Sequence, residues 1–298
     1  RSSVSDPKTS ITLKLNGGDT NGFPIPTSSA YAKNAAIMVL APGTYHNFTV
    51  EYSLYDQMTK IKGTVTKNYG ELTFYAGKNK KVAADLAVPH YASNIYYMWD
   101  AAVDQHVWKG HENDQLTLND AVSSYYPKVA SDSRWFNTAA HPTAASRSAA
   151  NCPNANEIRW YVQHGDPHWD SSIWSITKHL YAGGMWLKKG SVIAAEQHKT
   201  SQDLKNAAPN GKNYANGDVN SFKDYAISNE TITNGKPANL SNYIYFPAVG
   251  LYIQRQSDDH DGQLKDVGSR AYYWSSTARP YGNLIAYNLL IERGKVAA

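Results

Sequence analysis

The densest group of potentially reactive side chains lies in HGDPHWD, residues 164–170, which holds two histidines and two aspartates. Two imidazoles four residues apart can share a metal ion when both lie on one face of a helix. Pro167 stands between them and prevents a regular helix, because it has no amide hydrogen and clashes with the preceding turn. A metal site also needs three or four converging ligands. We therefore favour a turn, in which the aspartates bond to the backbone, over a metal site.

A second acidic segment, DDHDG at residues 258–262, has some likeness to a calcium-binding loop. The EF-hand pattern requires oxygen ligands at alternate positions and a glutamate at the twelfth. The twelfth residue counted from Asp258 is Ser269, and the alternate positions do not fit. The segment is therefore more typical of a solvated turn than of a calcium site.

Nucleophilic chemistry has one notable candidate, Cys152, the single cysteine of the chain. It precedes Pro153 and a helix cap at Asn154, and a thiolate near a helix N-terminus can be activated. No histidine can be selected as its partner, and neither Gly-x-Ser-x-Gly nor a Walker loop is present. We therefore interpret Cys152 as a buried structural residue that forms no intrachain disulfide. We predict no catalytic residue, no cofactor and no enzymatic activity.

The composition favours a β-rich, loop-rich extracellular protein. The 298 residues include 22 tyrosines and many small polar residues, and only 18% are charged. Aromatic residues suit strands, and small polar residues suit turns. The net charge of +4 comes from scattered residues, so no basic stripe indicates nucleic acid as a partner. No apolar run approaches the roughly 18 residues of a membrane span.

The distribution of tryptophan predicts two domains, 1–88 and 89–298. All eight tryptophans follow residue 98. In the first domain, alternation at 11–15 and 48–52 and the apolar run 35–40 indicate strands. Further strands are expected near 60–66, 70–76 and 81–88. About six short strands separated by turns predict an antiparallel β-sandwich.

The second domain mixes helices and strands. Its clearest helix is Asn154–His164, where Asn154 and Glu157 form a capping pair and Gly165 is a natural stop. A short helix is expected at Leu116–Ser123. Other expected elements are mainly long polar loops at 187–242, a strand at 243–252 interrupted by Pro247, and a final hairpin of 271–276 with 283–291.

The polar loops are where we expect a ligand surface, because long loops are usually functional or disordered. Within 187–242 and 256–261, polarity and loop position select five candidate ligand-binding residues: Tyr214, Asn216, Asp218, Asp258 and Asp261.

Several separate segments carry a resemblance to a known family. They are CPNANEIRWYVQHGDPHWD at 152–170, GGMWLKK at 183–189, YFPAVGLY at 245–252 and GQLKDVGSRAYYWSST at 262–277. In this order they resemble the C-terminal region of Bacteroidales fimbrillin-like surface proteins. LAPGTYHNFTVEY at 40–52 and KKVAADLAV at 80–88 resemble the second β-sandwich of fimbrillins.

The resemblance implies a transthyretin- or fimbrillin-like β-sandwich followed by a C-type-lectin-like mixed α/β domain. It implies an exported protein of the cell surface, a pilus tip or accessory subunit that joins other subunits by strand addition. It also implies a host or microbial glycan or protein as ligand. The Glu-Pro-Asn, Gln-Pro-Asp and Trp-Asn-Asp motifs of calcium-dependent lectins are absent. A free-standing carbohydrate-binding module and a purely structural pilus subunit remain the alternatives.

In such a domain YYWSST, residues 272–277, resembles a late core strand. Alternation places Tyr272 and Trp274 on one face and Tyr273 and Ser275 on the other. We favour a buried Trp274 over a sugar-stacking one. The predicted structural core includes three tryptophans: Trp160, Trp186 and Trp274.

Overall fold

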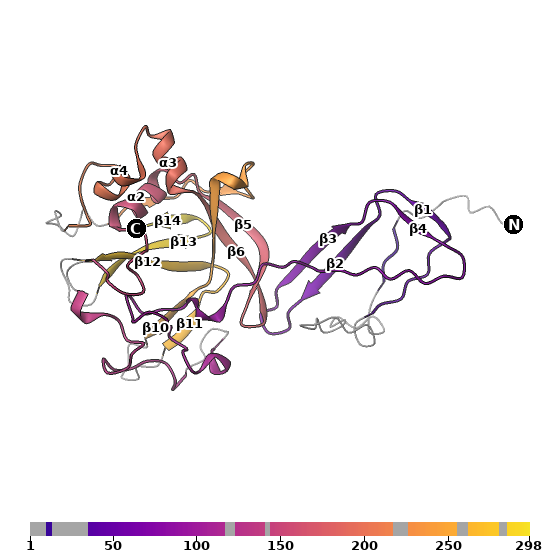
Figure 1. The fold of residues 1–298 in the computed structure, drawn as a ribbon, viewed down its shortest axis with the longest axis horizontal. Helices are drawn as coiled ribbons and strands as arrows, with labels where there is room; N and C mark the ends of the chain where they lie inside the picture. Colours follow the sequence, from indigo (N-terminus) through magenta and orange to yellow (C-terminus); the bar gives the residue numbers. More distant parts are fainter. Residues whose placement is uncertain are drawn as a thin grey trace. The chain divides into compact units, whose positions relative to one another are not determined.

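The computed structural model describes residues 10–13, 35–116, 123–140, 144–216, 226–254, 262–279 and 285–298. The chain divides into two compact units, Arg1–Ala87 and Val88–Ala298 (Figure 1). The division lies one residue from the predicted boundary. Strands make up 33% and helices 14%, so the expected β-rich class is confirmed.

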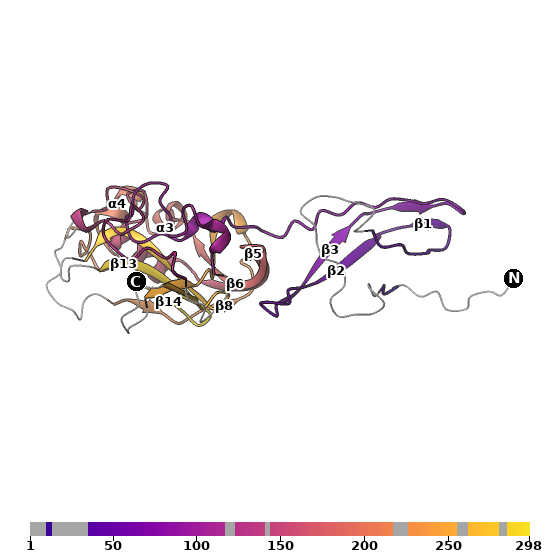
Figure 2. The ribbon, with the colours of Figure 1, turned by 90° about the horizontal axis from the view of Figure 1, so that it is seen from below.

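Unit 1, Arg1–Ala87, contains two short antiparallel pairs. Strand β1 (Gly43–Tyr45) pairs with β4 (Leu72–Phe74). Strand β2 (Thr49–Tyr55) pairs with β3 (Lys62–Asn68), and Figure 2 shows the two strands side by side. The alternation predicted near residue 50 is confirmed, because even-numbered residues of β2 are shielded and odd-numbered ones exposed.

Three predicted strands of unit 1 are wrong. The run Ala35–Leu40 has no regular structure, and Ile37 and Val39 are 85% and 89% exposed. Residues 10–13, the described part of the predicted strand at 11–15, and residues 81–88 likewise form no strand. Apolar composition alone does not make a strand, since each strand needs a neighbour to pair its backbone groups. Among the described residues no neighbour pairs with these segments.

Unit 2, Val88–Ala298, contains two four-stranded sheets. The first has the order β8–β5–β6–β9. Strands β5 (His168–Ile176), β6 (His179–Lys188) and β9 (Tyr243–Pro247) are antiparallel neighbours, and β8 (Thr233–Asn234) runs parallel to β5.

The second sheet has the order β12–β13–β14–β7 and is antiparallel throughout. Its strands are Arg270–Ala278, Ala286–Glu292, Lys295–Ala297 and Ser228–Asn229. The predicted final hairpin is therefore confirmed as β12 and β13. The break at Pro247 is also confirmed, because β9 ends there and β10 (Leu251–Gln254) pairs instead with β11 (Gly262–Lys265).

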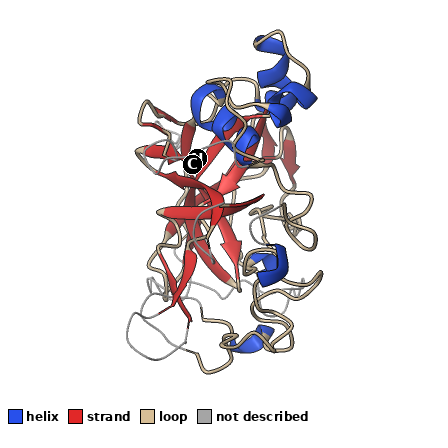
Figure 3. Cartoon of the chain, turned by 90° about the vertical axis from the view of Figure 1, so that its left-hand side faces the viewer, coloured by secondary structure: helices blue, strands red, loops and turns tan. Residues whose placement is uncertain are grey.

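Three α-helices lie together beside the strands of unit 2 (Figure 3). Helix α2 (Ala155–His164) is the predicted one. Asn154 accepts hydrogen bonds from the Asn156 and Glu157 amides, and the Glu157 carboxylate completes the capping box. Helices α3 (Gly190–Glu196) and α4 (Ser201–Asn206) fall in 187–242, where the prediction of mainly long loops missed them.

Short 3₁₀ turns complete the helical content of the described residues, at Ser93–Ile95, Glu112–Asp114, Thr138–Ala140 and Leu240–Asn242. Of the predicted helix Leu116–Ser123, residues 117–122 lie outside the described residues. No helix in the described ranges has the length and hydropathy to cross a bilayer.

The core of unit 2 lies between the inner faces of its two sheets. Met185 and Leu187 of β6 meet Leu289 and Ile291 of β13 in one buried cluster. The rings of Phe246 and Tyr273, from the two different sheets, make an edge contact at 5.1 Å. The outer faces of the two sheets therefore point away from one another.

The long segment between residues 88 and 150 has little regular structure and is tied together by buried polar groups. Asp100, 1% exposed, accepts the amide hydrogens of Ser146, Arg147 and Ala149. Its Oδ2 also accepts from the Asn137 side chain at 2.7 Å. These bonds join two stretches of chain about forty residues apart and satisfy backbone donors that no helix or sheet could pair.

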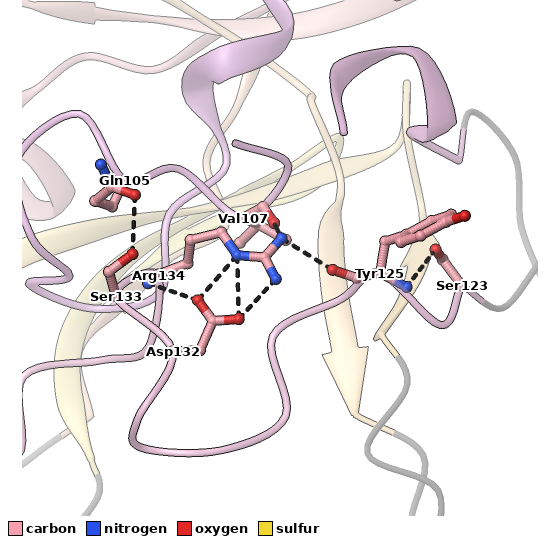
Figure 4. A network of polar contacts seen from close by, with 7 residues as sticks. All are labelled: Gln105, Val107, Ser123, Tyr125, Asp132, Ser133 and Arg134. Atoms are coloured by element: carbon pink, nitrogen blue, oxygen red, sulfur yellow. Dashed lines mark hydrogen bonds and ion pairs between the residues drawn. The ribbon is translucent and has the colours of Figure 1, made fainter. Parts of the chain in front are cut away.

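A second polar network holds the neighbouring loops (Figure 4). Arg134 pairs with both carboxylate oxygens of Asp132 and donates to the carbonyls of Val107 and Tyr125. Because all these partners belong to loops, we interpret the network as a brace that replaces missing secondary structure.

Candidate ligand-binding face

The outer face of sheet β8–β5–β6–β9 brings the HGDPHWD and GGMWLKK segments together. Strand register aligns His168, Trp186 and Tyr245 in one row across β5, β6 and β9. Their chain neighbours Trp169 and Met185 point to the opposite, buried side. We define the Trp186 face as the outward residues of these three strands: His168, Asp170, Trp186, Lys188, Tyr243 and Tyr245.

The Trp186 ring is partly exposed and held in one orientation. Its indole N–H donates to Asp170 Oδ2 at 3.0 Å, and its ring packs on Tyr245 with centroids 4.9 Å apart. Asp170 is itself buried and accepts the Ser172 amide hydrogen, while the exposed Lys236 ammonium lies 3.9 Å from it. A tryptophan fixed by its N–H offers a ring face to a ligand without further loss of entropy.

Tyr245 fits because the residue beside it is a glycine. A Cβ on Gly184 would lie 2.5 Å from the Tyr245 hydroxyl. Burial first, and then the charge of Asp170, raise the pKa of Tyr245, so its phenol stays protonated. The hydroxyl of Tyr245 and Nδ1 of His168 are buried polar atoms without a hydrogen-bond partner among the described residues. Such atoms are uncommon in stable interiors and often mark a functional region.

Several charged side chains surround one end of the Trp186 face. Asp166 Oδ2 accepts the Tyr243 hydroxyl at 2.6 Å and lies 3.6 Å from His168 Nε2. Lys188 lies 3.9 Å from the same oxygen and 2.9 Å from Glu196. Asp166 has a left-handed backbone (φ 46), a strained conformation for a non-glycine residue. The Asp166 side chain is about half exposed, so its carboxylate is accessible to a ligand.

The surroundings of Asp166 and Tyr243 set the protonation state of both side chains. Burial acts to raise the pKa of Asp166, but the hydrogen bond from Tyr243 and the nearby His168 and Lys188 outweigh it and lower the pKa. Burial and then the bond to Asp166 raise the pKa of Tyr243. At neutral pH Asp166 is therefore a carboxylate and Tyr243 a phenol. Neither has the intermediate pKa that suits a general acid or base.

The side chains of the Trp186 face can contribute to recognition of a ligand. The face combines an oriented indole, carboxylate acceptors and ammonium donors, which together suit a ligand carrying hydroxyl or amide groups. Cys152 does not join it: the thiol is half-buried, and burial and then Asp100 raise its pKa, which keeps it protonated.

The two histidines of HGDPHWD lie on different elements. His164 ends α2 and packs against Trp160 with ring centroids 5.1 Å apart, whereas His168 begins β5. The expectation that Pro167 separates them is confirmed. Within the described ranges, no three His, Cys, Asp or Glu side chains are placed to share a metal ion.

Of the five predicted ligand-binding residues, Tyr214 is wrong as a surface residue. It is 3% exposed, the Arg159 guanidinium lies 3.7 Å from its ring centroid, and its amide hydrogen bonds to Asn156. The Tyr214 ring is therefore buried although the segment around it is polar. Asn216 is exposed, while Asp218, Asp258 and Asp261 lie outside the described residues.

The predicted core tryptophans divide in three ways. Trp160 is buried against Ile193 and Leu204, as expected. Trp186 is only partly buried on the face named after it, and Trp274 is 36% exposed, so both expectations of core packing are wrong. The alternation was right: Ser275 points inward and is fully buried, which forces Trp274 outward.

One signal in the sequence did mark the face. In HWD, residues 168–170, polar and apolar residues alternate with the period of a strand. The interpretation of 164–170 as a turn overlooked this for residues 168–170, which open β5. The pairing of His168 with Trp186 and Tyr245 depends on register between distant strands, which no local pattern reveals.

Comparison with protein-family models, with curated proteins and with solved structures found no match to this chain.

Proposed function

We propose that this chain is a non-enzymatic adhesion protein of the bacterial cell surface, a pilus tip or accessory subunit. In this proposal unit 1 is a fimbrillin-type β-sandwich that joins other subunits, and unit 2 is a C-type-lectin-like domain that binds a host or microbial ligand. The observation that carries the proposal is the Trp186 face, where an oriented indole is flanked by Asp170 and Lys236.

The surface of unit 1 supports a role in assembly. Strands β2 and β3 pair with each other and, among the described residues, with no third strand. The extended apolar run Ala35–Leu40 is exposed, with Ile37 and Val39 almost fully so. Unpaired strand edges and exposed apolar segments are the surfaces through which strand addition works.

A purely structural pilus subunit is the second candidate, and the same exposed run favours it. A free-standing carbohydrate-binding module is the third. The three differ in what they bind: the adhesin binds a ligand and other subunits, the structural subunit binds subunits alone, and the module binds a glycan alone.

The deciding experiment is an array of glycans and host-matrix proteins probed with the purified chain, with calcium and with EDTA. We expect saturable binding that EDTA does not change. Trp186→Ala, and Lys236→Ala at the exposed rim, should each weaken binding, the former at least tenfold. Tyr75→Ala, which removes a 70% exposed ring from unit 1, is the matched control and should bind like the parent chain.

Other outcomes discriminate between the candidates. Binding that EDTA abolishes would replace the proposed mode by a calcium-dependent one. No binding at all would reject the adhesin in favour of the structural subunit. Self-association measured by light scattering, compared with an Ile37→Asp variant, then tests assembly: loss in the variant supports strand addition through the 35–40 run.

A further inference from the structure

The second sheet of unit 2 displays an aromatic residue on its outer face. In β12, β13 and β14, Trp274 is the one exposed residue, and the others are buried or intermediate. Its indole N–H donates to the Tyr97 carbonyl at 2.8 Å. The ring is therefore anchored by its edge while more than a third of its surface faces solvent, which is the reverse of a core tryptophan.

The neighbours of Trp274 extend this surface. Tyr272 lies two residues away on the same face of β12, about 6.8 Å along the strand. Across the ladder, Asn288 stands opposite Trp274 and Leu290 opposite Tyr272. The Asn288 amide has no hydrogen-bond partner in the described part of the chain, so both its donor and its acceptor are available. We call Tyr272, Trp274, Asn288 and Leu290 the Trp274 platform.

The charged side chains beside the platform pair with one another, one guanidinium with two carboxylates. Arg270, the next outward residue of β12, lies 3.5 Å from Asp266 and 3.7 Å from Glu292. The platform itself carries no charged side chain. Because the carboxylates outnumber the guanidinium, an acidic ligand would be repelled here, whereas a neutral ligand would not.

The size of the platform argues against a protein partner. A stable protein interface covers about 800 Å² on each side. Two aromatic rings, one leucine and one amide, of which only Trp274 reaches 36% exposure, fall short of that area. An area of this size fits one or two sugar rings, because a pyranose stacks its apolar face on an aromatic ring while its hydroxyls bond to a nearby amide.

We propose that the Trp274 platform is a binding site for a neutral oligosaccharide, with Trp274 and Tyr272 as stacking surfaces and Asn288 as the hydrogen-bonding group. This site goes beyond the proposed adhesive function, because it adds a second binding site with its own ligand class. It lies on a different sheet from the Trp186 face, with the core between them, so neither site needs the other.

The test is titration of the full chain with soluble hexasaccharides of glucose, mannose, xylose and galactose, followed by tryptophan fluorescence and calorimetry. Sialyllactose and a heparin hexasaccharide serve as anionic comparisons. We expect at least one neutral hexasaccharide to bind and to change the tryptophan fluorescence. Trp274→Ala should weaken that binding at least tenfold, Trp274→Phe less than fivefold, and Trp186→Ala less than twofold.

Asn288→Ala is the control for misfolding, since it removes the amide but no aromatic packing. We expect its affinity for the neutral hexasaccharide to fall threefold or more while its melting temperature stays unchanged. Preference for the anionic sugars, or equal binding by Trp274→Ala and the parent chain, would overturn the proposal. Absence of neutral-sugar binding would also overturn it. None of these outcomes decides the array experiment, in which the adhesive function is judged by the ligands whose binding Trp186→Ala weakens.

Discussion

Replacing Asp100 by asparagine should destabilise unit 2 strongly although it changes only one atom. The two carboxylate oxygens of Asp100 accept four hydrogen bonds, two each, and every donor is an N–H group. An asparagine must turn its NH₂ toward one of these pairs, so two donors lose their acceptor and meet another donor. Its backbone is not strained further, because asparagine tolerates the left-handed conformation (φ 50) as well as aspartate does.

The magnitude follows from the count of orphaned donors. Leaving a buried donor unsatisfied costs about 1–3 kcal/mol, so two lost bonds correspond to about 2–6 kcal/mol. For a unit of this size each kcal/mol lowers the melting temperature by about 2–4 °C. We therefore expect the melting temperature of unit 2, measured by calorimetry, to fall by roughly 4–24 °C. Trp274 should also become more mobile, because its anchor, the Tyr97 carbonyl, precedes Asp100 by three residues.

Asp104→Asn is the matched control for calorimetry. Asp104 has the same left-handed backbone (φ 58) but is exposed. Its substitution should change stability by less than about 0.5 kcal/mol. Equal melting temperatures for the two variants would refute the reasoning. The hydrogen bonds of Asp100 would then make no net contribution to the stability of unit 2.

Three further outcomes are expected. Gly184→Ala should cost about 1–3 kcal/mol in chemical unfolding, since its Cβ would press on the Tyr245 ring, whereas Gly294→Ala, with open space around it, should be neutral. Asn154→Ala should cost about 1 kcal/mol through loss of the α2 cap, and Asn154→Asp should restore most of it. Asp166 has a lowered pKa, so its stabilisation is present above about pH 4 and is lost as the pH falls through the folded-state pKa. Asp166→Asn should therefore be less stable than the parent chain at pH 7, by up to about 1 kcal/mol, and converge with it in acid; unfolding curves that stay parallel down to pH 2 would contradict this.

Local signals in the sequence predicted the elements that are stabilised locally. The capping residues Asn154 and Glu157 mark the start of α2, and Gly165 its end, because the same side chains that define the pattern make the cap bonds. The alternation in YYWSST likewise set which residues of β12 face inward. Such features depend on neighbours within four residues and are readable from the chain alone.

Features that depend on distant partners were not readable. The run Ala35–Leu40 has the composition of a buried strand, but nothing local states whether a partner strand exists. Helix α4 shows the opposite error: Thr200 and Asp203 form a capping box, yet the polarity of the segment hid it. Trp274 was predicted to be buried because it is a large aromatic residue, although the alternation along the strand placed it on the face opposite Ser275.

The candidate site was missed for the same reason. Its members lie on β5, β6 and β9, and only register brings His168, Trp186 and Tyr245 into one row. The sequence search favoured polar loops, while the structure places an oriented aromatic ring on a rigid sheet. A rigid sheet positions a side chain more accurately than a loop does, which is the property that a recognition surface requires.

The reactivity of the Cys152 thiol can report on local opening of the chain. A protonated, half-buried thiol reacts slowly with alkylating reagents until the surrounding chain opens. Since Cys152 lies two residues before the cap of α2, its rate of modification measures how often the start of that helix comes apart. A single thiol means a single alkylation reaction to follow, so each variant described above can be ranked by mass spectrometry in native buffer, without denaturant.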